Sequence, residues 1–244
     1  MAIRLTRSGS QRINLIASNP AFQNVTGGTL MLWVNAVDVS AAQEHVVAFS
    51  NGISNVGARM YLTLNRISST TFDVQGSSRR LDGDAFQAIA TSGSAFAAGV
   101  WHHIALVCAF DGQSQILYVD GNNVASATPA SWTGATSNTP SNQSSINGLA
   151  DGSGSFSNTT TQDVRVYQRA LSSAEIKQIW KAQGGDRIRR TIWNRYILDN
   201  GATGTTAASN TARDYGPAAR TGDPLNSPTW AAGILKRPKA RGWR

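Results

Sequence analysis

Apolar and polar residues alternate along this 244-residue chain in short runs, and turn-forming residues separate the runs. Residues 30–34 are apolar on both alternating faces, as is typical of a strand buried on both sides. At 60–65, three apolar residues alternate with Tyr61, Thr63 and Asn65, which predicts one buried and one wetter face. We expect roughly ten to twelve strands, enough for two packed sheets. Further runs lie at 72–74, 86–90, 104–110, 116–119 and 164–166.

The pattern predicts one helix, at 172–183. Ser172 can cap its N-terminus, and Glu175, three residues later, completes a capping box. Leu171 can pack on Ile176 as a hydrophobic staple. Two glycines then supply the C-terminal stop.

Two motifs point to a family. Residues 100–121 read VWHHIALVCAFDGQSQILYVDG, and residues 163–180 read DVRVYQRALSSAEIKQIW. Together they resemble the laminin-G-like (concanavalin A-like) jelly-roll family, in which a Trp-His strand leads to a Tyr-Val-Asp-Gly hairpin and a late strand enters a short helix. The resemblance implies an all-β fold, a two-sheet antiparallel jelly-roll sandwich with one short α-helix and a C-terminal extension. It also favours a binding or structural role over catalysis.

The chain divides into three expected regions. Residues 1–185 form the jelly roll, and 234–244 form a basic tail. Between them, 186–233 contains a run that resembles the segment preceding the first sandwich strand in this family. Because its aromatic residues can serve as packing anchors, we expect it to pack on or complete the sandwich. A loose C-terminal extension is the alternative.

Charge and cysteine content narrow the picture. The formal net charge is +8, and the last eleven residues hold five cations and no acid. The single cysteine, Cys108, excludes an internal disulfide, and its place on an apolar strand face predicts a buried, inert thiol. We expect neither a secretory signal nor a membrane span, because the N-terminal residues lack an apolar core and the longest apolar run is short.

The titratable residues do not suggest an enzyme. Glycoside hydrolysis in related folds needs two carboxylates that flank the scissile bond. The chain has only two glutamates, Glu44 and Glu175, and the capping box already accounts for Glu175. Asp82 and Asp84 lie in a glycine-containing turn, where aspartate is favoured for turn formation alone. The motif of adjacent histidines at 102–103 is expected to order a strand end. We therefore expect no catalytic residues.

Calcium is the one cofactor left open, since laminin-G-like domains can hold Ca²⁺ with loop oxygens. Its candidate ligands are Asp111, Asp120 and Asp151. Asp111 and Asp120 each precede a glycine, so a hairpin turn explains them equally well. Zinc is not expected, because no Cys/His cluster is present.

A glycan site needs an exposed ring beside amides, because rings stack on sugar faces and polar groups take the hydroxyls. Trp132 with Asn142 and Gln143 could supply this. The alternative places Trp132 as a lid folded over the rim of the sandwich.

The tail reads ILKRPKARGWR. We predict that it docks on a neighbouring subunit, with cations pairing to carboxylates and the tryptophan filling a pocket. Contact with nucleic-acid phosphates is not expected, because five charges without a fold context are weak support, and a solvated tail is the third alternative. The predicted assembly contacts are Lys236, Arg237, Lys239, Arg241, Trp243 and Arg244.

These observations converge on a phage virion protein. The resembled family is most familiar in exported proteins, whereas we expect no secretory signal and no internal disulfide here. Both expectations suit a protein that is assembled in the host cytoplasm and released by lysis. By fold-level analogy, we expect a capsid decoration (cement) protein or a tail or fibre component, present in many copies and bound to other virion subunits. A free carbohydrate-binding lectin that recognises a cell-surface glycan is the alternative, and an accessory domain of a larger adhesin is a third.

Overall fold

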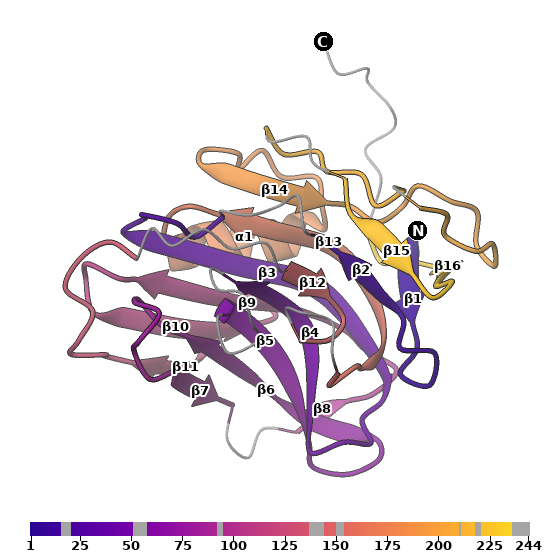
Figure 1. The fold of residues 1–244 in the computed structure, drawn as a ribbon, viewed down its shortest axis with the longest axis horizontal. Coiled ribbons are helices and arrows are strands. Elements are labelled where there is room, and N and C mark those ends of the chain that lie inside the picture. Colours follow the sequence, from indigo (N-terminus) through magenta and orange to yellow (C-terminus); the bar gives the residue numbers. More distant parts are fainter. Residues whose placement is uncertain are drawn as a thin grey trace.

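The computed structural model describes residues 1–15, 21–50, 58–91, 95–136, 144–149, 154–209, 211–217 and 221–235. These residues form two antiparallel sheets that pack face to face (Figure 1). The predicted all-β sandwich with one short helix is confirmed. The sixteen strands exceed the expected ten to twelve, because strands of two to four residues are too short to produce a visible alternation.

The first sheet has eight strands. Its order is β11 (Asn122–Ala127), β10 (Ser114–Val119), β9 (Trp101–Ala109), β3 (Gly27–Asp38), β13 (Asn158–Tyr167), β1 (Ala2–Leu5) and β16 (Thr229–Ala231), with β14 (Ile192–Tyr196) also on β13. Its two longest strands, β3 and β13, pair with each other along most of their length.

The second sheet also has eight strands. Its order is β15 (Asp223–Leu225), β2 (Arg12–Asn14), β12 (Ser144–Ile146), β4 (Gln43–Ser50), β5 (Ala58–Arg66), β6 (Thr71–Ser78) and β7 (Gln87–Ala90), with β8 (Phe96–Ala97) on β6.

The main core lies between the sheets and contains one face of each. On β3, Leu30, Leu32 and Val34 point into it, whereas Met31 belongs to a second cluster on the outer face of the sheet. This arrangement confirms that the strand is buried on both sides. Cys108 also lies in the main core, where burial raises the pKa of its thiol to about 12, so it is unreactive as predicted.

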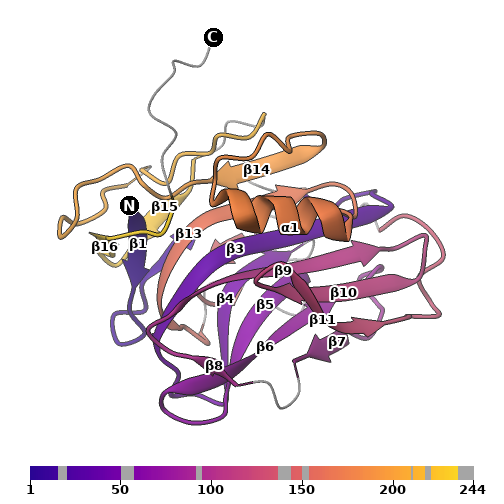
Figure 2. The ribbon, with the colours of Figure 1, turned by 180° about the vertical axis from the view of Figure 1, so that it is seen from behind.

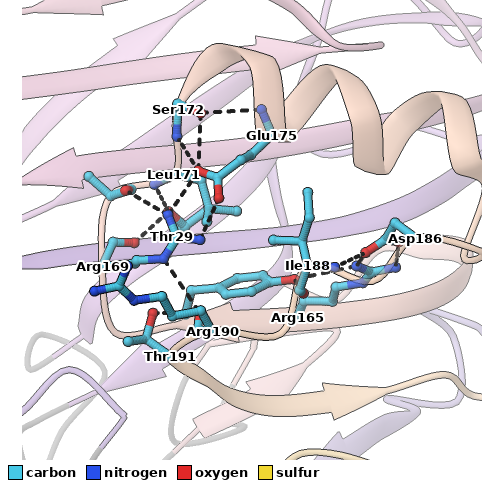
Figure 3. A network of polar contacts seen from close by, with 12 residues as sticks. Thr29, Arg165, Arg169, Leu171, Ser172, Glu175, Asp186, Ile188, Arg190 and Thr191 are labelled. Carbon is cyan, nitrogen blue, oxygen red and sulfur yellow. Dashed lines mark hydrogen bonds and ion pairs between the residues drawn. The ribbon is translucent and has the colours of Figure 1, made fainter.

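The single helix, α1 (Ser173–Ala182), covers the second cluster on the outer face of the first sheet (Figure 2). Ser172 and Glu175 form the predicted capping box. Arg169 holds the Glu175 carboxylate through two bonds of 2.8 and 2.6 Å, and the Thr29 hydroxyl ties the same turn to β3 (Figure 3). The helix ends one residue earlier than the glycines suggest, because Gln183 itself takes the left-handed conformation.

The region after the helix is part of the sandwich. Its strands β14, β15 and β16 pair with β13, β2 and β1, so the region extends both sheets. Tyr196, Leu198 and Trp230 from this region lie in the main core. The described part of 186–233 therefore packs on the body and is not a loose extension.

A buried network of charges joins this region to β13. Asp163 takes a left-handed conformation (φ 49°) at a bulge of β13. Its carboxylate accepts bonds of 2.6 Å from Arg165 and 2.8 Å from Arg195 of β14. Arg165 also bonds both oxygens of Asp186, at 2.9 and 2.8 Å. Burial alone would raise the pKa of Asp163, but the two guanidinium groups outweigh it and hold that pKa well below its usual range.

Candidate functional site

The predicted aromatic platform of a glycan site is not on the surface. Trp132 has 0% exposure and lies in the main core, with its ring centroid 4.9 Å from that of Phe110. A ring in this position cannot stack on a sugar. The expectation of an exposed platform at Trp132 is therefore wrong, because contact with the core buries the ring. Asn142 and Gln143 lie outside the described residues.

Two of the three candidate calcium ligands, Asp111 and Asp120, are described by the structure, and they lie in different turns. Asp120 accepts hydrogen bonds from the His103 backbone N–H and pairs with the His102 ring, each at 2.8 Å, so it orders the hairpin. Asp111 is exposed in the preceding turn, between β9 and β10, and Asp151 lies outside the described residues. Across the described ranges, no three His, Cys, Asp or Glu side chains are grouped as a metal site would require.

The two glutamates and the turn aspartates are engaged in holding loops. Glu44 is buried and accepts bonds from Arg7 and from two backbone N–H groups of the β3–β4 turn. Asp82 pairs with Arg59, and Asp84 accepts a bond of 3.0 Å from the backbone of its own turn. The tail residues predicted as assembly contacts, at 236–244, lie outside the described part of the chain.

A different candidate site lies on the outer face of the second sheet. The strand register places the side chains of Tyr61, Thr63 and Asn65 on this face, because their neighbours along β5 point into the core. No helix covers this face within the described structure, whereas α1 covers the outer face of the other sheet (Figures 1 and 2). The polar residues of β4 and β6 join the same surface.

Aromatic rings form one half of this outer face. Tyr61 and Phe86 are both partly exposed and pack against Ala48, with their ring centroids 5.3 Å apart. His45 lies 5.0 Å from the Tyr61 ring, and the guanidinium of Arg79 lies 4.8 Å from the Phe86 centroid. The small side chain of Ala48 leaves the two large rings as the dominant apolar surface.

A chain of amides forms the other half of the outer face. Gln43 of β4 donates to Asn65 of β5 at 3.4 Å, Asn65 donates to Gln75 of β6 at 3.2 Å, and Gln75 donates to Ser77 at 3.1 Å. Each amide has four hydrogen-bonding positions and uses only some of them in this chain. The remaining donors and acceptors are available to a ligand that has several hydroxyl groups.

Thr63 forms the floor between the rings and the amides. The register places it between His45 on β4 and Gln75 on β6, and its side chain is fully buried. Its Oγ1 and the Nδ1 of His45 are buried and have no hydrogen-bond partner in the described structure. Both atoms have almost no accessible surface, so in this structure they lie beneath the outer face, out of reach of a ligand.

We expect the protein to lose stability as the pH falls from about 6.5 to about 4. Burial lowers the pKa values of His45 and His103 to about 4 from 6.5. In this window the unfolded chain binds more protons than the folded chain, so the free energy of unfolding decreases as the pH decreases. For each histidine the loss is about 1.4 kcal/mol for each unit of pKa difference.

Urea unfolding at pH 7.5, 5.5 and 4.5 measures this effect. A His45→Gln variant should show a shallower pH dependence than the wild type. An unfolding free energy that is the same at pH 7.5 and 4.5 would contradict the assignment.

The sequence carried only part of the signal for this site. The alternation at 60–65 predicted a wetter face with Tyr61, Thr63 and Asn65. Nothing in the pattern showed that Gln75 and Phe86 lie beside them, because strand pairing brings together residues that are distant along the chain.

No helix in the part of the chain that the structure describes is long and apolar enough to cross a membrane.

Comparison with solved structures supports the fold. A protein from Bacteroides ovatus ATCC 8483 with a proposed carbohydrate-binding function superposes with a TM-score of 0.66 at 16% identity, covering 96% of this chain and 61% of that chain. The CBM40 domain of the Ruminococcus gnavus IT-sialidase gives 0.56 at 14% identity, covering 73% and 95%. The enzymatically active domain of tailspike protein 2 from Bacteriophage CBA120 gives 0.55 at 14% identity, covering 83% and 32%.

The family comparison is more specific than these fold similarities. A comparison with curated proteins found no match. The Laminin_G_3 model of the concanavalin A-like lectin/glucanases superfamily matches residues 7–177, which is more than half of the chain. The chain therefore belongs to the concanavalin A-like lectin/glucanases superfamily.

Proposed function

We propose that the protein is a non-catalytic carbohydrate-binding module whose site is the outer face of the second sheet. The observation that carries the proposal is the pair of partly exposed rings, Tyr61 and Phe86, beside the amide chain of Gln43, Asn65 and Gln75. Rings stack on the apolar faces of sugars, while amides bind their hydroxyl groups.

The charge balance of the outer face supports the same proposal. Arg79 is balanced by the neighbouring Asp82 and Asp84, so the outer face suits a neutral glycan. The carbohydrate-binding relatives named above share the fold, which is consistent with such a role.

The proposed lack of catalysis rests on how the carboxylates are used. Both glutamates are bonded to arginines, and Asp163 and Asp186 are held by Arg165 in the buried network. A general acid must hold a proton near neutral pH. The Arg169 hydrogen bond instead lowers the pKa of Glu175 to about 2.

A glycan array followed by calorimetric titration of the best neutral ligand tests the proposal. Tyr61→Ala should weaken binding about tenfold or more, the loss expected for a central aromatic contact. Tyr215→Ala is the matched control, since Tyr215 is also an exposed tyrosine beside an arginine and lies off this face. Equal affinity of the Tyr61→Ala variant and the wild type, or release of reducing sugar during titration, would refute the proposal.

A second candidate function is a structural component of a phage virion, either a capsid decoration protein or a tail or fibre protein. The basic tail at 234–244 favours it as an assembly arm, and the similarity in fold to a phage tailspike domain is consistent with it. In the native particle, a chain lacking 236–244 should be incorporated less than the full chain at the same salt. Equal incorporation would exclude the arm.

A further inference from the structure

A carboxylate lies on the outer face of the second sheet, beside the amide chain. Asp73 of β6 is opposite Asn65 of β5 in the strand register, and the two strands are neighbours in the sheet (Figure 1). It lies two residues before Gln75, so both side chains are on the same face of β6. Its chain neighbours, Phe72 and Val74, point into the main core. Asp73 is therefore a member of the outer face.

The carboxylate of Asp73 has no hydrogen bond or ion pair in the part of the chain that the structure describes. Its Oδ1 is buried, whereas the residue as a whole is partly exposed, so Oδ2 is the oxygen that a ligand can reach. By contrast, Glu44 and Asp82 are paired with Arg7 and Arg59. A buried carboxylate oxygen without a donor lowers the stability of a fold, so stability alone gives no reason for an acid at this position.

The distance between Asp73 and the aromatic rings sets the length of a ligand that touches both. Tyr61 and Asn65 are four residues apart on β5, which corresponds to about 13 Å along an extended strand. Asp73 lies opposite Asn65, whereas Ser77 lies opposite Tyr61. One pyranose ring is shorter than this span, so a sugar stacked on Tyr61 does not reach Asp73. A ligand that contacts both ends must contain at least two linked sugars.

A carboxylate at this end also selects the charge of the ligand. An ionised carboxylate only accepts hydrogen bonds, and bonds from hydroxyl groups to it are roughly twice as strong as those between neutral groups. Neutral sugars supply several such donors. A uronic acid or a sulfated sugar would instead bring a second negative charge next to the unpaired carboxylate, and the two charges would repel each other.

We propose that the site binds a neutral oligosaccharide along β5, and that Asp73 is the residue that excludes acidic sugars. One sugar stacks on Tyr61 and Phe86, and a sugar further along the chain donates its hydroxyl groups to Asp73 Oδ2. Gln75 lies between the two ends and binds the sugar between them through its free amide positions. This inference rests on the proposed carbohydrate-binding function and adds to it the length and the charge of the ligand.

Calorimetric titration with β-linked oligosaccharides of glucose, mannose and galactose, each from one to four units, tests the length. In the series that binds, the affinity should rise about tenfold or more between one and three units, because the longer ligand adds the charge-assisted bonds to Asp73. A monosaccharide that binds as tightly as its trisaccharide would overturn the proposed span.

The same oligosaccharides, oxidised at C6 to carboxylates, test the charge. The wild type should bind the neutral form about tenfold or more tightly than the oxidised form. Asp73→Asn keeps the shape of the side chain and removes its charge. It should weaken binding of the neutral form about fivefold and reduce the preference over the oxidised form about tenfold. Because Asp73 makes no bond within the fold, this variant should be at least as stable to urea as the wild type.

Asp111→Asn is the matched control, since it makes the same change of charge at an exposed turn between β9 and β10. It should leave the affinities and the preference unchanged. If Asp73→Asn also leaves them unchanged while Tyr61→Ala loses binding, the role of Asp73 is wrong and the carbohydrate-binding function stands. If the wild type binds none of the oligosaccharides, both are wrong.

Discussion

A chain that ends at Gly185 is expected not to fold into a stable domain. The truncation removes β14 and β16, which pair with β13 and β1 of the first sheet, and β15, which pairs with β2 of the second sheet. It also removes three large core side chains, Tyr196, Leu198 and Trp230. Each buried side chain of this size contributes about 1.5–3 kcal/mol, and whole domains are stable by only about 5–15 kcal/mol.

Circular dichroism and urea unfolding of the two chains measure this loss. The control is a chain that ends at Leu235, which keeps all three strands and should unfold with the same midpoint as the full protein. A cooperative transition of the chain ending at Gly185 at the wild-type urea concentration would show that the C-terminal strands add nothing to stability.

Replacing Asp163 by alanine is expected to destabilise the fold by about 3–5 kcal/mol, the range found when one partner of a buried ion pair is removed. The side chain is fully buried, and it neutralises Arg165 and Arg195 at once. Without it, Arg165 keeps its ion pair with Asp186, whereas Arg195 loses the carboxylate that it pairs with.

Urea unfolding at pH 7 checks this value, with Asp111→Asn as the control because Asp111 is exposed in a turn. Asp163→Asn keeps the shape of the side chain and should lie between the alanine variant and the wild type. If Asp163→Ala and Asp111→Asn have the same unfolding free energy, the buried network contributes no stability. The lowered pKa of Asp163 also means that its contribution is present above the ordinary pKa of aspartate and is lost only at lower pH.

Local signals in the sequence predicted the helix and most of the long strands well. The capping box of Ser172 and Glu175 depends on residues three apart, and it formed as expected. The two apolar faces of β3 were equally local, and both are buried as predicted. On β5, Tyr61 and Asn65 are partly exposed as the alternation predicted, whereas Thr63 is fully buried. Short strands such as β12 and β16 have too few residues to show an alternation, so the sequence did not predict them individually.

The chain's own pattern of residues was enough to establish an all-β sandwich with a single capped helix and an inert Cys108. Tertiary structure alone decided that Trp132 is a core residue, because whether a loop tryptophan is buried depends on which distant residues pack on it. It also brought Gln43, Tyr61 and Gln75 from three strands onto one face, and placed Leu235 beside Gly184. Local periodicity reports which way a side chain points, whereas strand order and packing determine its neighbours, and a binding surface consists of neighbours.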